Sequence, residues 1–569
     1  MKRAIAVLMI LSCAAFGQQK APRATTATYQ ISGVVVSATT GEALAGASVM
    51  LSPALSSRAR LPLRPGRRNG PDDERVVRSA ADGTFAFGGI APGKYSLSAV
   101  RHGYPQQSFE EHDQFASAIV VGPDKVSTGI RFRMEPDASI SGTVLDEHNE
   151  PVMNAMVMLF RDGIQNGRHG VFRAQEVMSN DLGRYHFAHL KAGKYYVAVS
   201  GTPWYAENGR VAYGGGAGGG RVMSSVTTYV GPGPGTGNAA LDVAYPFTFY
   251  PGVTDSSQAE PISIVPGQRE SADFTLAAVP SLHVRVRVPV DNPERNVIAM
   301  MTREVFGSTD VGGSVRNMNY GQGVTEIAGV TPGRYILQLR GIGPERGQQL
   351  LTQREIEITG DTEINSVDAP SGVNLSGTIR FDGPAPTGAV RLMLRKLGMP
   401  TPPLQVNDKG EISASEPIAP GKYDVFLPMP NYQITQISVK GAALDGQTID
   451  VGSDDVHFAI EAAKASANIE GTALKGDKAV AGAMIVLVPQ DMSRPMLYRR
   501  DQSDSDGSFE LTSIPPGTYT LVAIENGWDL EWSNPEVMKP FLASGEKVQV
   551  AIDGHYHVDA KVQSIPGAQ

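Results

Sequence analysis

The stretch "DGTFAFGGIAPGKYSLSAV", residues 82–100, decides the fold of this chain. Apolar residues alternate with small or polar ones on both sides of a Pro-Gly pair. Because successive side chains of a strand point to opposite faces, Tyr95, Leu97 and Ala99 share one face. Proline fixes φ and glycine tolerates positive φ, which suits a tight turn. The stretch therefore predicts a hairpin of two short strands with one apolar face.

This signature returns four times, as "DLGRYHFAHLKAGKYYVAVS", "GQGVTEIAGVTPGRYILQLR", "DKGEISASEPIAPGKYDVFLP" and "DGSFELTSIPPGTYTLVAI". Its anchor glycines are Gly93, Gly193, Gly333, Gly421 and Gly517. Intervals of roughly 90 to 140 residues are too long for a solenoid repeat and long enough for a domain with its own core. We therefore predict five separate modules that follow one another like beads on a string.

A second shared element precedes each signature, as in "ISGVVVSATTGEALAGASVML" from Ile31 and "ISGTVLDEHNEPVMNAMVMLF" from Ile140. Related strings begin at Leu375 and Ile469, whereas the string from Leu282 lacks the glycine. Each predicts a hairpin or a crossing between two sheets. About seven short strands per module, without a long helical period, indicate an all-β tandem array of about five antiparallel β-sandwich domains.

These strings resemble the carboxypeptidase regulatory-like domain, a transthyretin- or prealbumin-like β-sandwich related to starch-binding-like modules. The second module also contains "FYPGVTDSSQAEPISIVPGQRESADFTL", which resembles arrays of such modules in bacterial envelope proteins. The resemblance is strongest in the first, second and fifth modules and weakest in the third. It implies an Ig-like or prealbumin-like fold, and it does not specify a function, because sites are grafted onto folds.

The repeats divide the chain into a signal peptide, a linker and five modules. The predicted ranges are 1–17 for the signal peptide, 18–29 for the linker, and 30–136, 137–279, 280–370, 371–461 and 462–569 for the first to fifth modules.

The N-terminal stretch "MKRAIAVLMILSCAAFGQQK" has a basic tip, an apolar run and small residues before Gly17. It predicts a secretory signal peptide, so we expect a secreted, periplasmic or cell-surface protein. The apolar run is too short for a membrane span, and we expect no other span after cleavage. A cut before Cys13 would leave an unusually short signal, so we interpret Cys13 as part of the apolar core rather than a lipoprotein cysteine.

Composition excludes several classes of protein. Cys13 is the only cysteine among 569 residues, so the mature chain is neither a disulfide scaffold nor a thiol enzyme nor a cysteine zinc protein. A net charge of −8 is mild for this length and does not suggest nucleic-acid binding.

The largest insertion, residues 201–246, interrupts the second module with glycine tracts and four aromatic residues. Aromatic rings stack on sugar rings, so this insertion is the predicted ligand-binding site. The alternative is that the aromatic residues pin a long loop onto its own sandwich. The candidate residues are Trp204, Tyr205, Tyr213 and Tyr229.

Three charged clusters carry weaker hypotheses. Arginines between Arg58 and Arg68 could contact anionic glycans or lipid head groups, or form a solvated loop. The acidic residues of "DQSDSDGSFE", from Asp501 to Glu510, could bind calcium, although an Asp-Gly turn explains Asp506 without a metal. His555, His557 and Asp559 alternate along a strand and could bind zinc or copper, or lie exposed at an edge.

No catalytic motif stands out, since the chain has no nucleophile elbow, phosphate loop or HExxH. The resemblance implies an accessory module without its enzyme, so we assign no catalytic, cofactor or metal residues. We predict an exported, non-enzymatic binding or adhesion protein of the cell envelope whose partner is a polysaccharide or an envelope protein. The alternatives are a structural spacer or scaffold that presents a protein-partner site and, third, an unrecognised hydrolase. The sequence does not specify an oligomeric state.

Overall fold

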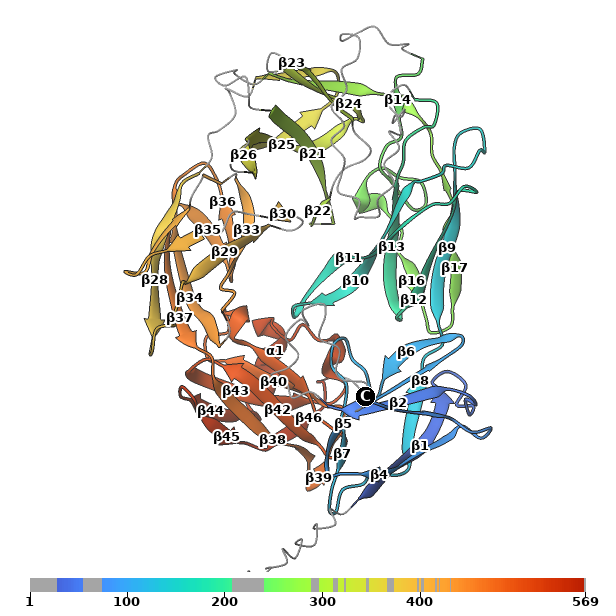
Figure 1. Cartoon of the computed structure of the whole chain (residues 1–569), viewed down its shortest axis with the longest axis vertical. Helices are drawn as coiled ribbons and strands as arrows, with labels where there is room; N and C mark the ends of the chain where they lie inside the picture. The colour runs from blue at the N-terminus through green and yellow to red at the C-terminus, as the bar shows by residue number, and fades with distance from the viewer. Residues whose placement is uncertain are drawn as a thin grey trace, which may run out of the picture.

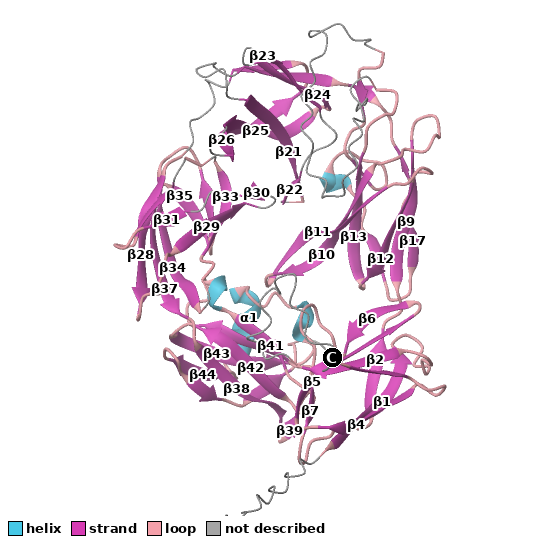
Figure 2. Cartoon of the chain, viewed as in Figure 1, coloured by secondary structure: helices cyan, strands magenta, loops and turns pink. Residues whose placement is uncertain are grey.

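A computed structural model shows a chain built almost entirely from strands (Figure 2). The signal peptide, Cys13 and the arginines from Arg58 to Arg68 lie outside the residues that it describes. Described are residues 28–54, 74–206, 240–287, 296–306, 308–310, 316–321, 324–343, 347–365, 373–396, 399–400, 404–414, 417–418, 420–429 and 431–566.

The first two modules each consist of two facing sheets. In the first module, one sheet has β1 (Tyr29–Ser37), β4 (Thr84–Ile90) and β8 (Ile130–Met134), and the other has β2 (Ser48–Pro53), β3 (Arg75–Arg78), β5 (Gly93–Arg101), β6 (Tyr104–Ser108) and β7 (Ile119–Val121). In the second module, one sheet has β9 (Ala138–Leu145), β12 (Arg184–Leu190), β17 (Arg269–Ser271) and β18 (Phe274–Thr275), and the other has β10 (Met156–Gln165), β11 (Arg168–Met178), β13 (Gly193–Ser200), β15 (Thr248–Phe249) and β16 (Ile262–Ile264). A ribbon of β14 (Val243–Ala244) and β19 (Val279–Pro280) and the 3₁₀ turn η3 (Ser256–Gln258) complete it.

The third and fourth modules follow the same plan. The third has β20 (Leu282–Arg287), β23 (Arg316–Gly321), β24 (Val324–Val330) and β27 (Thr362–Asn365) facing β21 (Asn296–Val305), β22 (Ser308–Asp310), β25 (Gly333–Gly343) and β26 (Gly347–Ile358). In the fourth, one hydrogen-bonded path joins β28 (Leu375–Asp382), β29 (Arg391–Lys396), β30 (Met399–Pro400), β31 (Leu404–Val406), β32 (Glu411–Ala414), β33 (Gly421–Phe426), β34 (Tyr432–Lys440), β35 (Ala442–Asp445), β36 (Thr448–Val451) and β37 (Val456–Lys464).

The fifth module adds helical turns to its strands. Its elements are β38 (Ala467–Lys475), β39 (Lys478–Ala479), β40 (Met484–Pro489), η5 (Pro495–Leu497), β41 (Arg499–Gln502), β42 (Ser508–Ile514), β43 (Gly517–Ile524), η6 (Gly527–Asp529), α1 (Pro535–Leu542), β44 (Glu546–Val550), β45 (His555–His557) and β46 (Ala560–Gln563). The short helix α1 was not predicted. Its signal is the sequence Asn-Pro-Glu, in which the Asn534 side chain caps the helix by accepting from the Glu536 amide at 3.0 Å.

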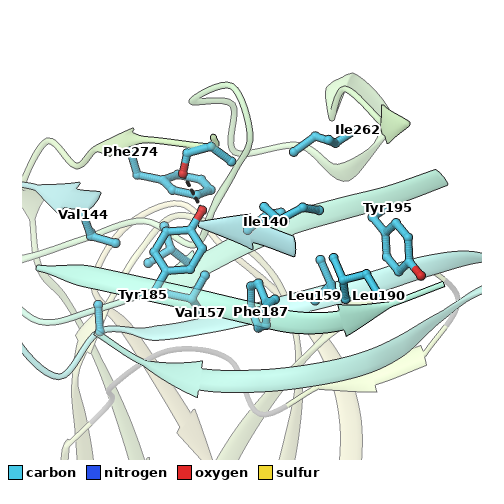
Figure 3. Packing of buried hydrophobic residues seen from close by; sticks show 14 of the residues in the cluster. Ile140, Val144, Val157, Leu159, Tyr185, Phe187, Leu190, Tyr195, Ile262 and Phe274 are labelled. Carbon is cyan, nitrogen blue, oxygen red and sulfur yellow. Dashed lines mark hydrogen bonds between the residues drawn. The ribbon is translucent and has the colours of Figure 1, made fainter. Parts of the chain in front are cut away.

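The predicted fold class is confirmed, because a separate hydrophobic cluster lies between the sheets of each of the five modules. Figure 3 shows the cluster of the second module, where Ile140 and Phe187 face Val157 and Leu159 across the core. The predicted inward face of the signature strand is buried at Tyr519, Leu521 and Ala523 and at the matching residues of the other modules, except that Tyr95 of the first module is half-buried. Alternation of apolar residues was therefore sufficient to find the cores.

One feature departs from a purely antiparallel sandwich. In each module the first strand pairs in parallel with a closing strand, as β1 does with β8 and β28 with β37. The glycine of the "ISG" motif permits this pairing in the first module, because a Cβ on Gly33 would lie 2.0 Å from the carbonyl oxygen of Ile130.

The predicted signature hairpin is wrong in its pairing. β4 pairs with β1, whereas β5 pairs with β2, so the Pro-Gly segment carries the chain from one sheet to the other. The same crossing separates β42 from β43. Both strands carry large apolar residues inward, and a crossing lets them cover the core from opposite sides. If the two strands paired as a hairpin, the apolar residues of both would lie in the same sheet.

A tyrosine two residues after the turn glycine locks this crossing. The Tyr519 hydroxyl donates to the carbonyl of Pro515 at 3.0 Å, and the Tyr195 hydroxyl donates to that of Lys191 at 2.7 Å. Each bond satisfies a buried or half-buried hydroxyl within its own turn. The tyrosine of the signature is thus explained by local geometry.

The modules are not beads on a string, because the chain closes into a ring in which the first and fifth modules lie side by side (Figure 1). Backbone bonds cross the closure, since the Ser505 amide donates to the carbonyl of Ala118 at 2.9 Å. The β10–β11 hairpin of the second module also reaches the fifth module, where the Ser533 amide donates to the carbonyl of Gly167 at 3.2 Å. No helix among the described residues combines the length and apolarity that a membrane crossing requires.

Candidate functional site

Three loops meet at one end of the second module, and we call them the loop face: residues 146–155, 179–183 and 201–206. The Asn154 amide donates to the carbonyl of Ser179 at 3.0 Å, which joins the first two loops. The Tyr205 hydroxyl donates to Glu147 Oε1, which joins the third loop to the first. The loops follow strands of both sheets, so the sandwich itself fixes their positions.

Trp204 is the most prominent side chain of the loop face. It is 72% exposed, although its ring packs edge-on against Tyr205 with ring centroids 5.7 Å apart. Partial burial and the bond to Glu147 raise the pKa of Tyr205 to about 12, so its hydroxyl remains a donor at any physiological pH. The indole is therefore held in place while most of its surface faces water.

The structure brings together two of the four predicted ligand-binding residues, Trp204 and Tyr205. The other two, Tyr213 and Tyr229, lie outside the described residues. Sequence reasoning missed the acidic turn beside them, which contains Asp146, Glu147 and His148. The signal for this turn was present in the string "LDEHNEP", which holds three acidic residues and a histidine.

Exposed apolar side chains also gather on the loop face. Met153, Met178 and Leu182 are each more than half exposed. Met153 and Leu182 belong to the first and second loops of the loop face, and Met178 is the last residue of β11, directly before the second loop. Such a surface can stack on a ring, cover an apolar body and accept hydrogen bonds at its edge.

The acidic cluster proposed for calcium serves the ring closure instead. Asp504 accepts from Lys94 Nζ at 2.6 Å and from the Ala118 amide at 2.9 Å. Asp506 lies 2.6 Å from Lys125 Nζ. These two aspartates thus face lysines of the first module rather than an open cation site, and the remaining acid, Asp501, accepts from the Glu510 amide at 2.9 Å.

The protonation states agree with this assignment. Burial acts to lower the pKa of Lys94, but the attraction of Asp504 and Asp506 outweighs it and the pKa is raised. Burial also acts to raise the pKa of Asp506, and the bonds from Lys125 and Ser508 bring it below its usual value. Burial prevails at Asp504, whose pKa is raised in spite of Lys94.

An aromatic cluster also joins the first and fifth modules. His112 stacks on Trp528 with ring centroids 4.6 Å apart, and the Arg500 guanidinium lies 4.7 Å from the centroid of Phe115. Trp528 belongs to the segment between β43 and β44, which also contains Trp532 and helix α1. Sequence reasoning missed this segment, although it holds two of the three tryptophans of the chain.

The second and third modules contact each other through the aromatic ring of Phe306 and through a charged cluster around His283. Phe306, in the turn between β21 and β22, packs on Phe160 and Tyr196, with ring centroids 5.2 and 4.8 Å away. His283 of the third module pairs with Asp242 of the second through Nε2 at 2.6 Å, while Nδ1 pairs with the buried Glu326. Hydrogen bonding to Glu326 is the largest influence on the pKa of His283, which rises to about 9.

The C-terminal histidines lie on β45 with exposed side chains. His557 Nε2 is 3.7 Å from Asp559 Oδ1, and Asp559 Oδ1 also accepts from the Thr472 amide at 2.9 Å. Within the described residues, the group of potential metal ligands that converges is Asp146, Glu147 and His148 instead.

The chain was compared with known families and structures. A family model described as the carboxypeptidase regulatory-like domain matches residues 30–135 and 139–214. A comparison with curated proteins gave no match.

The solved structures to which the chain is similar include the following three. The TIE protein of Bacillus anthracis is 12% identical, with 96% of this chain and 76% of that chain covered and a TM-score of 0.16. A streptococcal ancillary pilin is 11% identical over 50% of this chain and 99% of that one, with a TM-score of 0.18. The major pilin subunit BcpA of Bacillus cereus is 9% identical, with 75% of this chain and 99% of that chain covered and a TM-score of 0.13.

These TM-scores describe dissimilar overall arrangements, so nothing about this chain follows from those three proteins. The family match is different in kind, because it falls on the first sandwich and on the part of the second sandwich that precedes residue 215. The carboxypeptidase regulatory-like domain is thus matched over residues 30–135 and 139–214, less than half of the chain.

Proposed function

We propose that this chain is an exported, non-enzymatic binding protein of the cell envelope that binds a polysaccharide at the loop face of the second module. The observation that carries the proposal is the 72% exposed indole of Trp204, held edge-on by Tyr205. An exposed tryptophan that is already positioned loses little side-chain entropy on binding.

The chemistry of the loop face suits a sugar. The apolar face of a sugar ring stacks on an indole, and sugar hydroxyls donate to carboxylates. Trp204 offers the stacking surface, and Glu147, one side chain away through Tyr205, offers acceptor oxygens. Small-molecule sites usually combine an apolar or aromatic surface with a small number of polar groups.

The ring gives this site a rigid support. The loop face belongs to a module that contacts the first, third, fourth and fifth modules, through Lys191, Phe306, Arg168 and Gly167 respectively. A closed ring does not extend reach as a spacer would, so we favour a scaffold that presents the loop face.

The test is binding of the full mature chain, from Gln18 onward, to a panel of polysaccharides. We expect saturable binding that Trp204→Ala weakens about tenfold or more, since stacking on an aromatic ring contributes roughly 1–3 kcal/mol. Phe426→Ala is the matched control, because Phe426 is 51% exposed on the fourth module and should leave binding unchanged. Equal binding by both variants would reject the site, and no binding by the folded wild type would reject the ligand class.

A protein partner is the second candidate, because Met153, Met178 and Leu182, on or directly before the loops of the loop face, are more than half exposed. Flexible apolar side chains such as methionine are common where proteins bind other proteins, and they offer no flat face on which a sugar ring can stack. Leu182→Asp separates the candidates: it should abolish binding to an envelope protein while polysaccharide binding persists. Turnover of any polysaccharide in the same panel would contradict a non-enzymatic role.

A further inference from the structure

Strand β4 of the first module has a free hydrogen-bonding edge. It is the end strand of its sheet, paired with β1, and it lies on the outer side of the ring (Figure 1). The Val35 amide donates to the carbonyl of Gly83 at 2.9 Å, and the backbone groups of an antiparallel pair alternate in direction along each strand. The backbone groups of Thr84, Ala86 and Gly88 therefore point away from β1.

Local bonds already occupy part of this edge. The Thr84 carbonyl accepts from the Ala80 amide at 2.8 Å, in the turn before the strand. The Gly88 carbonyl accepts from Arg75 Nη1 at 2.9 Å. Within the described residues no such bond reaches the amide or the carbonyl of Ala86, so both groups can pair with an added strand.

A side chain closes the matching edge of the fifth module. There the Glu510 amide, at the position of Ala86, donates to Asp501 Oδ2 at 2.9 Å. The registers of β2 with β3 and of β40 with β41 place Val77 at the position of Asp501. Valine has no acceptor atom in its side chain, so the first module lacks the group that closes this edge in the fifth.

The side chains of β4 do not protect the edge either. Thr84, Ala86 and Gly88 are exposed and uncharged. In the second module, the positions of Thr84 and Ala86 hold Arg184 and His186. Charged side chains on an edge strand discourage the addition of another chain, so β4 has a composition that accepts one.

An open hollow of about 560 Å³ lies beside this edge. Its lining includes Val77 and Arg78 of β3 and Thr84, Phe85 and Ala86 of β4. The Arg78 guanidinium has no ion pair or hydrogen bond with any residue that the structure describes. The hollow therefore combines apolar side chains with one unpaired positive charge, and it calls for an occupant that carries a negative charge.

The neighbouring segments of this chain have the wrong charge for Arg78. Residues 55–73, which join β2 to β3, hold five arginines and two aspartates. Residues 18–27, which precede β1, hold one lysine and one arginine. Charge complementarity thus favours an occupant from another protein.

We propose that the β4 edge of the first module binds an extended acidic peptide segment of a partner protein. The segment adds a strand to β4, pairs with the amide and carbonyl of Ala86, and places a carboxylate against Arg78. In complexes of this kind the backbone bonds supply affinity, and the pockets for side chains supply specificity. This surface belongs to the first module, so it is separate from the polysaccharide site proposed for the second.

The probe is a fluorescein-labelled peptide of alternating valine and threonine with one central glutamate, titrated into the full mature chain. We expect saturable binding by fluorescence anisotropy and slower hydrogen exchange of the amides of Thr84–Ile90 in the complex. A second peptide, with lysine in place of the glutamate, should bind about tenfold more weakly, because its ammonium would face Arg78.

Two variants separate the backbone from the charge. Ala86→Pro removes an amide that points away from β1, a change that edge strands tolerate, and it should weaken binding about tenfold or more. Arg78→Glu should reverse the preference, so that the lysine peptide binds more tightly than the glutamate peptide. His186→Pro makes the matching change in the second module and should bind as the wild type does.

Circular dichroism and the melting temperature of each variant separate loss of binding from loss of folding. Equal binding of the two peptides by the wild type, or an unchanged preference in Arg78→Glu, would overturn the proposal. So would absence of saturable binding of either peptide, undiminished binding by folded Ala86→Pro, or loss of binding in folded His186→Pro.

Discussion

Lys94 Nζ lies 2.6 Å from Asp504 Oδ2, although 410 residues separate the two in the chain. The entropic cost of closing so long a loop grows only slowly with its length, so a well-packed junction can overcome it. The packing is present, because Phe115 of the first module joins the cluster of Trp528, Met538 and Phe541. The closed ring thus follows from specific contacts between the first and last modules.

Reversal of one charge at this junction should open the ring. In Lys94→Glu the new carboxylate would face Asp504 and Asp506, and like charges in a half-buried site repel. We expect a larger radius of gyration in small-angle X-ray scattering. Lys194→Glu is the control, since Lys194 occupies the same signature position in the second module and is exposed. Identical scattering from both variants would show that the ion pair does not maintain closure.

The tryptophans of the chain should differ sharply in their effect on stability. Trp528 is 9% exposed and contacts His112 and Phe115, so Trp528→Ala should lower the stability of the fifth module by about 3–5 kcal/mol. Trp204→Ala should change stability by less than about 0.5 kcal/mol, because its side chain faces water. Hydrogen exchange of the β43 amides measures the loss in Trp528→Ala, and exchange of the β13 amides measures the effect of Trp204→Ala. Unchanged protection of β43 in Trp528→Ala would contradict the junction.

The signature tyrosine should stabilise each crossing through its hydroxyl. Tyr519→Phe leaves the ring in place and removes the bond to the Pro515 carbonyl, at a cost of about 1 kcal/mol. Tyr95→Phe removes the same bond, to the carbonyl of Ala91 at 3.0 Å, where the site is more exposed. We expect a smaller loss there, measured by chemical denaturation, and a larger loss at Tyr95 would argue against burial as the cause.

The joint between the second and third modules should weaken in alkali. The pKa of His283 in the folded chain is about 9, above its unfolded value near 6.5, because protonated His283 is bound by Glu326 and Asp242. A raised pKa stabilises the folded state fully below about pH 6.5, and the contribution disappears as pH rises through about 9.

The size of this effect is roughly 2 kcal/mol after allowance for solvent around the ring. Thermal melts between pH 6 and 10 should show the wild type losing stability relative to His283→Gln across that window. Parallel pH profiles for the two proteins would refute the assignment. Arg285 also faces Glu326, with Nε 3.5 Å from Oε2.

Period-two alternation was enough to predict the cores, because inward residues such as Leu97, Val197 and Leu521 obey it in every module. Two modules also bury apolar residues between these positions, notably Ala198 and Val522. Their sequences "YYVAVS" and "YTLVAI" are apolar on both faces, unlike "YSLSAV" of the first module. A strand that is apolar on both faces indicates that something covers its outer face as well as its inner one. The alternation of residues does not say which part of the chain covers that outer face.

Strand pairing was predicted less well. The Pro-Gly segment suited a hairpin turn locally, and the crossing between sheets depends on which partner each strand meets far away in the sequence. The candidate site was found in part, since Trp204 and Tyr205 were predicted while the acidic turn at Glu147 was not. Neighbouring loops at one end of a sandwich come from separate segments, so their proximity is a property of the fold.

The sequence by itself determined five β-sandwich cores, because the period of apolar residues and the chemistry of Pro, Gly and Tyr act over a few positions. The tertiary structure alone decided that Asp504 meets Lys94, that Trp528 meets His112, and that Glu147 meets Tyr205. The reason is physical: charge pairing and aromatic stacking need atoms a few ångströms apart, and only the packed chain brings residues hundreds of positions apart to that distance.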